Sequence, residues 1–296
     1  MSNKLNPAKY FPVSEKPLTM KSGLHDFGTD FGNGPRELLF FQQDKLAGLY
    51  RKCKELVPPE RHWCLCDSEE QLKLHQKAFP WLISRQEQEL NVSISPDLLS
   101  VQNQLLQGEN PDLTKSYHRL SLNVQEDIAL IADQPDSSLI MGHISMPSFW
   151  DPKKIKGASF CRIHEPVPNF PKNEQISKKL NRIISTKGPF VRFVWTIAND
   201  ERLDHHPENG RTAWKNEQPL WLRVERQITV PFEGLGALFL IRTYLYPINT
   251  LNKTECRTLS LAIENMPRDI AVYKGLWEGK ELILNYLSEA EKLREN

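Results

Sequence analysis

The chain has 296 residues, which is enough for one large domain or two small ones. Its 39% hydrophobic and 25% charged residues are ordinary for a soluble globular protein, and a net charge of +1 gives no support to binding of nucleic acid or of an anionic membrane. No apolar run approaches the roughly 20 residues of a membrane-spanning helix. Residues 1–21 also lack the continuous apolar stretch of a secretory signal. We therefore expect a cytoplasmic protein with no nucleic-acid or membrane partner.

The five cysteines follow neither a disulfide framework nor a metal-binding pattern. Their number is odd and their spacing irregular, so reduced thiols are expected. Cys64 and Cys66 form a C-x-C pair, which is more typical of two thiols on a strand or turn than of a zinc site. No four-cysteine pattern for an iron–sulfur cluster is present, so any such cluster is expected on another protein.

The first part of the chain is predicted to be an arm followed by helices. The arm, residues 1–35, ends in a glycine-rich stretch that is typical of a loop. Apolar residues recur at three- and four-residue steps across 37–56, which predicts a helix. A second helix is predicted for 67–79 with Ser68 as its cap, and a further apolar stretch at 98–106 also fits a helix.

From residue 117 onward the pattern changes to short strands with helices between them. The expected strands are 117–122, 128–132, 138–144, 190–197 and the two arms of a hairpin, 221–230 and 237–245, around a turn at 231–234; the expected helices are 174–184, 258–266 and 282–293. Strict alternation of strands and helices is missing, as are the G-x-G-x-x-G and Walker motifs of nucleotide-binding folds. The pattern favours an α+β fold. We expect one domain at 36–296 with its core at about 117–276.

His164 is the first candidate metal ligand. Prolines at 166 and 168 fix the backbone φ angle and stiffen the chain after it, and a stiff backbone can aim an imidazole at a metal. A hydrogen bond from the imidazole to a carbonyl at a turn is the alternative, and residue types alone favour it. His143, on an expected strand, is the second candidate ligand. The pair at 205–206 is expected to lie in a solvated loop.

The predicted hairpin concentrates charged side chains on two strands. Since side chains alternate along a strand, Arg223 and Glu225 share one face and Arg226 lies on the other. On the second arm, Arg242 and Tyr244 share a face. One explanation is a solvated sheet face with Arg–Glu pairs; the other is an inward face whose guanidinium groups hold carboxylates. Glu225 and Arg226 can line one pocket only if a bulge separates them.

Six motifs occur in a fixed order along the chain. They are Pro147–Trp150, Ile163–Pro168, Arg192–Trp195, Leu222–Gln227, Ile241–Tyr244 and Ala271–Leu276. In order and spacing they resemble the haem-dependent oxidative N-demethylase α-subunit-like family, over about 124–276 and more weakly over 43–56. Two features depart from the family: Val194 stands where asparagine is more frequent, and the spacer at 204–207 is particular to this chain.

The resemblance implies a PAS-like domain that binds haem b, with an antiparallel sheet, flanking helices and a helical N-terminal extension. It implies O2-dependent removal of a methyl group from a small secondary amine such as dimethylamine, with release of formaldehyde. It also implies electrons from NADPH, delivered through partner subunits that carry FMN and a 2Fe-2S cluster. The lack of nucleotide and cluster motifs in this sequence agrees with that division of labour.

If haem is the cofactor, residue roles follow as hypotheses. His164 is expected to be the axial iron ligand, with His143 as the second candidate. Arg226 and Arg242 are candidates for holding the haem propionates or polarising bound oxygen. Two further residues, Trp195 and Arg223, are expected to line the cofactor site.

Two residues are assigned to the substrate side of the expected reaction. Glu225 is expected to hold an alkylammonium, because a cation in a pocket of low dielectric needs a nearby anion. Tyr244 is expected to donate a hydrogen bond to the distal ligand. Two alternative functions remain open: a haem or small-ligand sensor of the same fold, and a non-catalytic binding protein.

Overall fold

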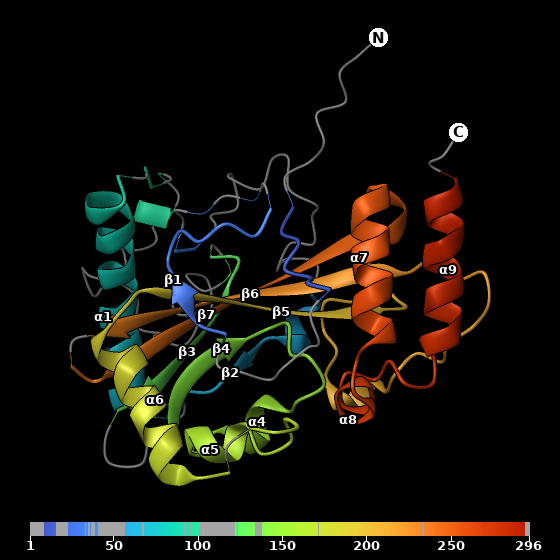
Figure 1. Cartoon of the computed structure of the whole chain (residues 1–296). Coiled ribbons are helices and arrows are strands. Elements are labelled where there is room, and N and C mark those ends of the chain that lie inside the picture. Colours follow the sequence, from blue (N-terminus) through green and yellow to red (C-terminus); the bar gives the residue numbers. More distant parts are fainter. Residues whose placement is uncertain are drawn as a thin grey trace.

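The computed structural model describes residues 9–15, 23–32, 34, 36, 39–40, 57–66, 68–91, 93–94, 96, 98–100, 103, 122, 124–133, 138–170, 172–232 and 234–293. Within these residues one antiparallel sheet has the strand order β1-β5-β6-β7-β3-β4-β2 (Figure 1). The strands are β1 (His25–Asp26), β2 (Trp63–Cys64), β3 (Asp127–Ala132), β4 (Leu139–Ile144), β5 (Phe190–Ala198), β6 (Trp221–Phe232) and β7 (Gly236–Pro247).

Helices cover both faces of this sheet (Figure 1). They are α1 (Glu69–Ser84), α4 (Pro152–Ile155), α5 (Phe160–Ile163), α6 (Glu174–Thr186), α7 (Lys253–Glu264), α8 (Arg268–Tyr273) and α9 (Lys280–Lys292). The antiparallel sheet with helices packed on it confirms the predicted α+β class. Within the described part of the chain, no helix has the length and apolar character needed to cross a bilayer.

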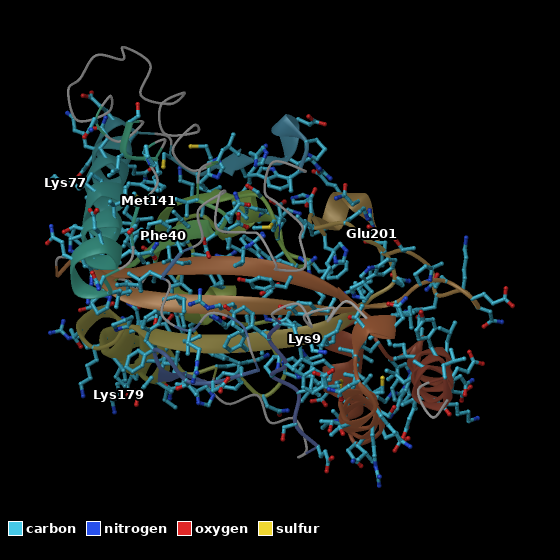
Figure 2. All side chains as sticks on the ribbon, turned by 90° about the horizontal axis from the view of Figure 1, so that it is seen from above. Lys9, Phe40, Lys77, Met141, Lys179 and Glu201 are labelled. Carbon is cyan, nitrogen blue, oxygen red and sulfur yellow. The ribbon has the colours of Figure 1, made fainter. Side chains whose placement is uncertain are left out.

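Each face of the sheet has its own buried core. On one face, Phe160 of α5 and Ile184 of α6 pack with Ala237 of β7. On the other, Val224 of β6 packs with helices α7 and α9, and Ile228 packs with α1. We name these the α6 face and the α7 face. Figure 2 shows the interior between α1 and the sheet at the labelled Phe40 and Met141, with Lys77 and Lys179 at the outer margins.

The predicted hairpin is the centre of the sheet. β6 pairs with β7 from Trp221–Pro247 to Phe232–Gly236 without a shift of register, and β5 pairs with the other edge of β6. The predicted turn at 231–234 was wrong in its first half, because Pro231 lies inside β6. Proline is tolerated there since pairing with β5 ends at Thr229, and the missing N–H leaves no broken ladder bond on that side.

The other predicted elements differ from the structure mainly at their ends. The helix predicted at 67–79 has Ser68 as its cap, as expected, but continues to Ser84 because α1 accommodates Pro80 inside it. Helix α7 begins at Lys253, five residues before its predicted start, because Asn252 and Glu255 form a capping box. Most of the predicted helix at 37–56, of the strand at 117–122 and of the apolar stretch at 98–106 lies outside the described residues.

Candidate functional site

His164 lies at the C-terminal end of α5 and lines a pocket on the α6 face. Its Nδ1 is 2.8 Å from the carbonyl oxygen of Phe160. Its ring is tilted against the Phe160 ring at 4.3 Å and stacks on Phe170 at 4.8 Å, measured between ring centroids. The remaining walls are mostly apolar and are formed by Leu24, Val167, Leu180, Ile184 and Phe239. Three polar side chains come from the sheet: Arg192, Gln227 and Thr229.

The environment of His164 favours its neutral form. Burial lowers the pKa of His164 to about 4, the charge of Arg192 acts in the same direction, and the bond to Phe160 opposes both. A carbonyl oxygen can only accept, so the proton of the neutral ring belongs on Nδ1. The lone pair is then on Nε2, which is the arrangement of a metal-ligating histidine. The two alternatives predicted for His164 therefore do not exclude each other: Nδ1 makes the hydrogen bond to a carbonyl, and Nε2 can still bind a metal.

A chain of hydrogen bonds runs along the α6 face from the interior to this pocket. Arg223 donates to Ser148 Oγ from Nε at 3.2 Å and from Nη2 at 2.9 Å. Ser148 Oγ in turn donates to Glu225 Oε1. Gln227 Nε2 donates to Glu225 Oε2 at 3.2 Å, and Arg192 Nη1 donates to Gln227 Oε1 at 3.4 Å. The Glu225 carboxylate is thus held between two arginines that lie mainly inside the protein.

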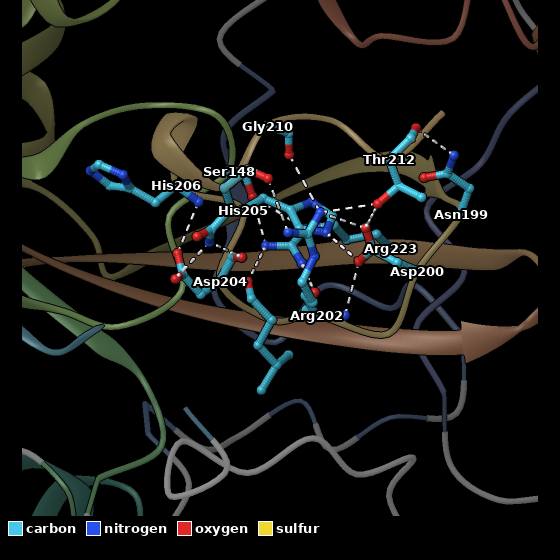
Figure 3. A network of polar contacts seen from close by, with 12 residues as sticks. Ser148, Asn199, Asp200, Arg202, Asp204, His205, His206, Gly210, Thr212 and Arg223 are labelled. Atoms are coloured by element: carbon cyan, nitrogen blue, oxygen red, sulfur yellow. Dashed lines mark hydrogen bonds and ion pairs between the residues drawn. The ribbon is translucent and has the colours of Figure 1, made fainter. Parts of the chain in front are cut away.

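Arg223 is only 1% exposed, and backbone carbonyls complete its coordination. Its Nη1 donates to the Arg202 carbonyl at 3.2 Å and its Nη2 to the Leu203 carbonyl at 2.9 Å. Burial lowers the pKa of Arg223, and the charge of Glu225 counteracts it. Figure 3 shows this guanidinium enclosed by the 199–212 loop. Arg223 therefore anchors the loop and orients Ser148, which differs from direct contact with a ligand beside His164.

The prediction that His205 and His206 lie in a solvated loop was wrong. They are 3% and 2% exposed. His205 Nε2 is 2.9 Å from Asp200 Oδ1, and the ring of His206 stacks on that of Trp63 at 4.7 Å between centroids. Burial alone would raise the pKa of Asp200, but hydrogen bonds from His205 and its other neighbours hold it well below its usual range. The loop is a compact polar structure (Figure 3).

Several predicted site residues lie on the opposite face of the sheet from His164. Register pairs Arg226 with Arg242, and Val224 with both Trp195 and Tyr244, so these side chains belong to the α7 face. All four named polar and aromatic residues are at most 4% exposed. The regular pairing of β6 confirms that Glu225 and Arg226 point to opposite faces.

The α7-face residues form an aromatic and arginine cluster with the N-terminal segment. Tyr10 packs on Tyr244 with ring centroids 5.1 Å apart, and its backbone N–H donates to Tyr246 Oη at 3.0 Å. The Arg226 guanidinium carbon lies 5.9 Å from the Tyr10 ring centroid. Burial raises the pKa of Tyr244 well above its ordinary value, so its hydroxyl keeps its proton. The structure does not bring this cluster together with the His164 pocket.

His143, the second candidate ligand, is fully buried on β4 and stacks on His62 with ring centroids 5.8 Å apart. It does not line the pocket that contains His164. Its register partner Ile128 is in turn paired with Leu240, which places His143 on the α7 face.

Two residues of the site were missed by sequence reasoning. Arg192 belongs to a recognised motif, but nothing in its local sequence shows that it lines the pocket with His164. Lys274 is only 8% exposed, and its Nζ donates to the Trp195 carbonyl. Burial lowers the pKa of Lys274 to about 8, while the charge of Glu225 opposes that shift. A lysine in an otherwise apolar stretch, as here between Val272 and Leu276, is the signal that was available.

The residue types that line the pocket suit a haem, but the open volume of the pocket is too small for one. An imidazole with a free Nε2 lone pair, aromatic and aliphatic walls and one guanidinium match an iron, a porphyrin and a propionate respectively. The open space is about 40 Å³, whereas ligand pockets typically measure about 300–1,000 Å³. The pocket in its present form is too small for a porphyrin, so a haem held by His164 would require the pocket to widen.

Comparison with known proteins agrees with this chemistry. No curated protein matches the chain. A family model described as haem-dependent oxidative N-demethylase, alpha subunit-like, matches residues 72–284. That range contains most of α1, all but two of the strands described above, and the six motifs on which the resemblance was based. The chain therefore belongs to the haem-dependent oxidative N-demethylase, alpha subunit-like family.

Proposed function

We propose that this protein binds haem b on the α6 face and is the haem-containing subunit of an oxidative N-demethylase. The expected substrate is a small secondary amine such as dimethylamine, which loses a methyl group as formaldehyde in an O2-dependent reaction. The family membership supports the reaction class. The sheet with its α5–α6 cover serves, in this proposal, as a PAS-like haem-binding domain.

The observation that carries the proposal is the state of His164. Its Nδ1 bond to Phe160 fixes the ring, and its depressed pKa keeps the ring neutral throughout the physiological range. Its ring is held between the Phe160 and Phe170 rings, which would shield a bound haem from water on that side. We assign His164 as the axial ligand, in preference to His143, because only His164 lines the pocket.

Arg192 is the residue that we assign to a haem propionate. It lines the same pocket as His164. Among the described residues its side chain donates one hydrogen bond, to Gln227, which is long at 3.4 Å, so its other N–H groups can bind a carboxylate. Bound haem supplies activation of dioxygen for oxidation of the N-methyl group. The protein contributes by holding the cofactor, keeping the pocket dry and placing the amine beside it.

Glu225 is the residue that we assign to the alkylammonium. Ser148 and Gln227 each donate one hydrogen bond to its carboxylate, and no cationic group of the described residues lies within ion-pair distance of it. The carboxylate is therefore oriented by neutral donors, with the charges of Arg192, Arg223 and Lys274 near it but none in a direct ion pair among the described residues, and in this proposal the alkylammonium occupies that direct position. Two donors on known oxygens also fix the plane of the carboxylate and hence the direction from which a cation approaches.

This proposal gives no contact with haem to Arg226, Arg242 and Tyr244. A haem held by His164 would lie on the α6 face, and the side chains of these three residues lie on the α7 face. Their earlier assignments to propionates and to the distal ligand require a haem on the α7 face. That arrangement is the alternative to be considered if His164 proves dispensable for haem binding.

The reaction needs electrons, and the sequence shows no nucleotide-binding or iron–sulfur motif through which this chain could supply them. We propose that they come from NADPH through reductase-type partner subunits with FMN and a 2Fe-2S cluster. The family description names an alpha subunit, which supports the existence of such partners.

The first test is a hemin titration of the purified protein, monitored by the Soret band and its shift with reduction and carbon monoxide. We expect stoichiometric binding by wild type and by His143→Gln, and a loss of affinity of at least about tenfold in His164→Ala. Circular dichroism of both variants controls for folding. Full haem retention in His164→Ala contradicts the assigned ligand, and absence of any band contradicts haem binding itself.

The second test measures amine-dependent NADPH oxidation with a reductase partner and dimethylamine. Glu225→Gln is expected to raise KM for the amine strongly while leaving the haem spectrum unchanged, because it removes the charge and keeps the shape. A haem spectrum without turnover in the wild type indicates the alternative function, a haem or small-ligand sensor.

A further inference from the structure

The sheet wall of the His164 pocket carries a buried hydroxyl group that has no hydrogen-bond partner among the described residues. This hydroxyl is Oγ1 of Thr229, a residue that is 2% exposed and lines the pocket. A β-branched residue suits this position on β6, but valine would supply the same shape without burying a hydroxyl. Burial of a hydroxyl without a partner costs free energy. The hydroxyl is therefore suited to a ligand that enters this pocket.

Arg192 lies beside Thr229 on the same wall. Register pairs Arg192 with Gln227, so Thr229, two residues further along β6, is its diagonal neighbour on one face of the sheet. Diagonal neighbours are about 7–8 Å apart, which a long side chain can span. Apart from the 3.4 Å bond to Gln227, the Arg192 guanidinium forms no hydrogen bond or ion pair with the described part of the chain. A guanidinium and a hydroxyl thus line one open space.

We propose that Arg192 and Thr229 together form a carboxylate-binding site, in which the guanidinium and the hydroxyl donate hydrogen bonds to one carboxylate. Hydrogen bonds to a carboxylate are charge-assisted, and they are stronger than those between neutral groups. Burial lowers the pKa of Arg192, while the charge of Glu225 opposes that shift. An anion bound directly to the guanidinium would further stabilise its charged form.

The carboxylate can come from two sources, a haem propionate or free formate. The open volume of about 40 Å³ has room for roughly three water-sized atoms, which is the size of formate. The propionate source rests on the proposed function and needs the wider pocket, whereas the formate source needs neither. His164 belongs to the α5 wall of the pocket, and its neutral ring carries no net charge that would act on an anion.

Thr229→Val tests the hydroxyl alone, because valine keeps the shape of the side chain. Thr243→Val is the matched control. Thr243 is 0% exposed, its hydroxyl has no hydrogen-bond partner among the described residues, and its register partner Glu225 places it on the same face of the sheet. It does not line the pocket. Neither substitution breaks a hydrogen bond within the described residues, so both variants are expected to fold, which circular dichroism checks.

The first arm of the test measures line broadening of ¹³C-labelled formate by the haem-free, full-length protein. A ligand of three non-hydrogen atoms is limited to a Kd of roughly 0.5 mM at best, so binding in the low millimolar range is expected for wild type and Thr243→Val. Thr229→Val is expected to bind formate about tenfold more weakly, because one hydrogen bond to a charged acceptor is lost. Hemin is expected to displace formate if both carboxylates use this site.

The second arm compares Soret titrations with hemin and with hemin dimethyl ester, whose propionates are esterified. Wild type and Thr243→Val are expected to bind hemin about a hundredfold more tightly than the ester, and Thr229→Val only about tenfold more tightly.

An effect of Thr229→Val in one arm alone assigns the carboxylate to that source. If hemin does not bind but formate behaves as expected, the proposed function fails and the carboxylate site stands. If Thr229→Val changes neither the formate affinity nor the ratio of hemin to ester affinity, the carboxylate site is overturned, even where His164 holds haem.

Discussion

The Ser148 hydroxyl joins Arg223 to Glu225, and replacing Ser148 with alanine tests whether that connection stabilises the protein. The substitution removes the acceptor of two hydrogen bonds from a guanidinium that is 1% exposed, and also a donor to the Glu225 carboxylate. Hydrogen bonds to charged groups contribute about 1.5–3 kcal/mol each, and a buried charged donor without an acceptor is penalised further. The two backbone carbonyls that also bind Arg223 remain. We therefore expect a loss of about 2–4 kcal/mol in the free energy of unfolding.

Urea denaturation measures this loss, and a double-mutant cycle with Glu225→Gln isolates the connection. The Ser148–Glu225 coupling is expected to exceed about 0.5 kcal/mol, as for other directly bonded pairs. Ser177→Ala is a matched control, because the buried Ser177 hydroxyl on α6 has no hydrogen-bond partner among the described residues. That variant is expected to be neutral or slightly stabilised. A Ser148→Ala cost below about 0.5 kcal/mol, or a coupling of zero, refutes the reasoning.

Three further perturbations follow from the same structure. Gly236→Ala is expected to cost at least about 3 kcal/mol in urea denaturation, because an added Cβ would lie 2.0 Å from the Ile131 carbonyl oxygen and force β3 from β7; a stable variant contradicts that packing. The pKa of Asp200 is lowered in the folded protein, so the ionised carboxylate stabilises the fold at pH values above its ordinary pKa, and this stabilisation is lost as pH falls below about 4. Asp200→Asn should lack this part of the acid dependence of stability, and a profile of stability against pH identical to that of wild type speaks against it. Lys274 is deprotonated at a lower pH in the folded than in the unfolded chain, so wild-type stability should rise between pH 8 and 10.5, by up to about 3 kcal/mol, whereas Lys274→Met should show no such rise.

Local signals in the sequence were enough for the elements that build the centre of the fold. Runs of β-branched and aromatic residues bounded by turn residues predicted β5, β6 and β7 within a few residues. The Ser68 cap and the three- and four-residue periodicity of α6 were equally local, and both were confirmed. The same alternation predicted that Glu225 and Arg226 point to opposite faces, because the direction of a side chain on an unbulged strand depends only on its position.

Family membership was also encoded in the sequence, as the order and spacing of six short motifs. The contacts between these motifs cannot be read from the sequence, because the motifs lie on separate loops, strands and helices. The sequence alone did not indicate that Ser148 from the first motif binds Glu225 from the fourth.

The tertiary structure decided which residues meet and which are buried. His205 and His206 are polar residues in a charged stretch, and contacts with Trp63 from β2 and with the carboxylates of Asp200 and Asp151 make a buried position stable for them. The same holds for the division of the arginines, since Arg192 joins His164 whereas Arg226 joins Tyr10 on the other face. These outcomes depend on contacts between residues far apart in sequence, whose free energy no local pattern contains, whereas strand alternation and helix caps depend only on neighbours along the chain.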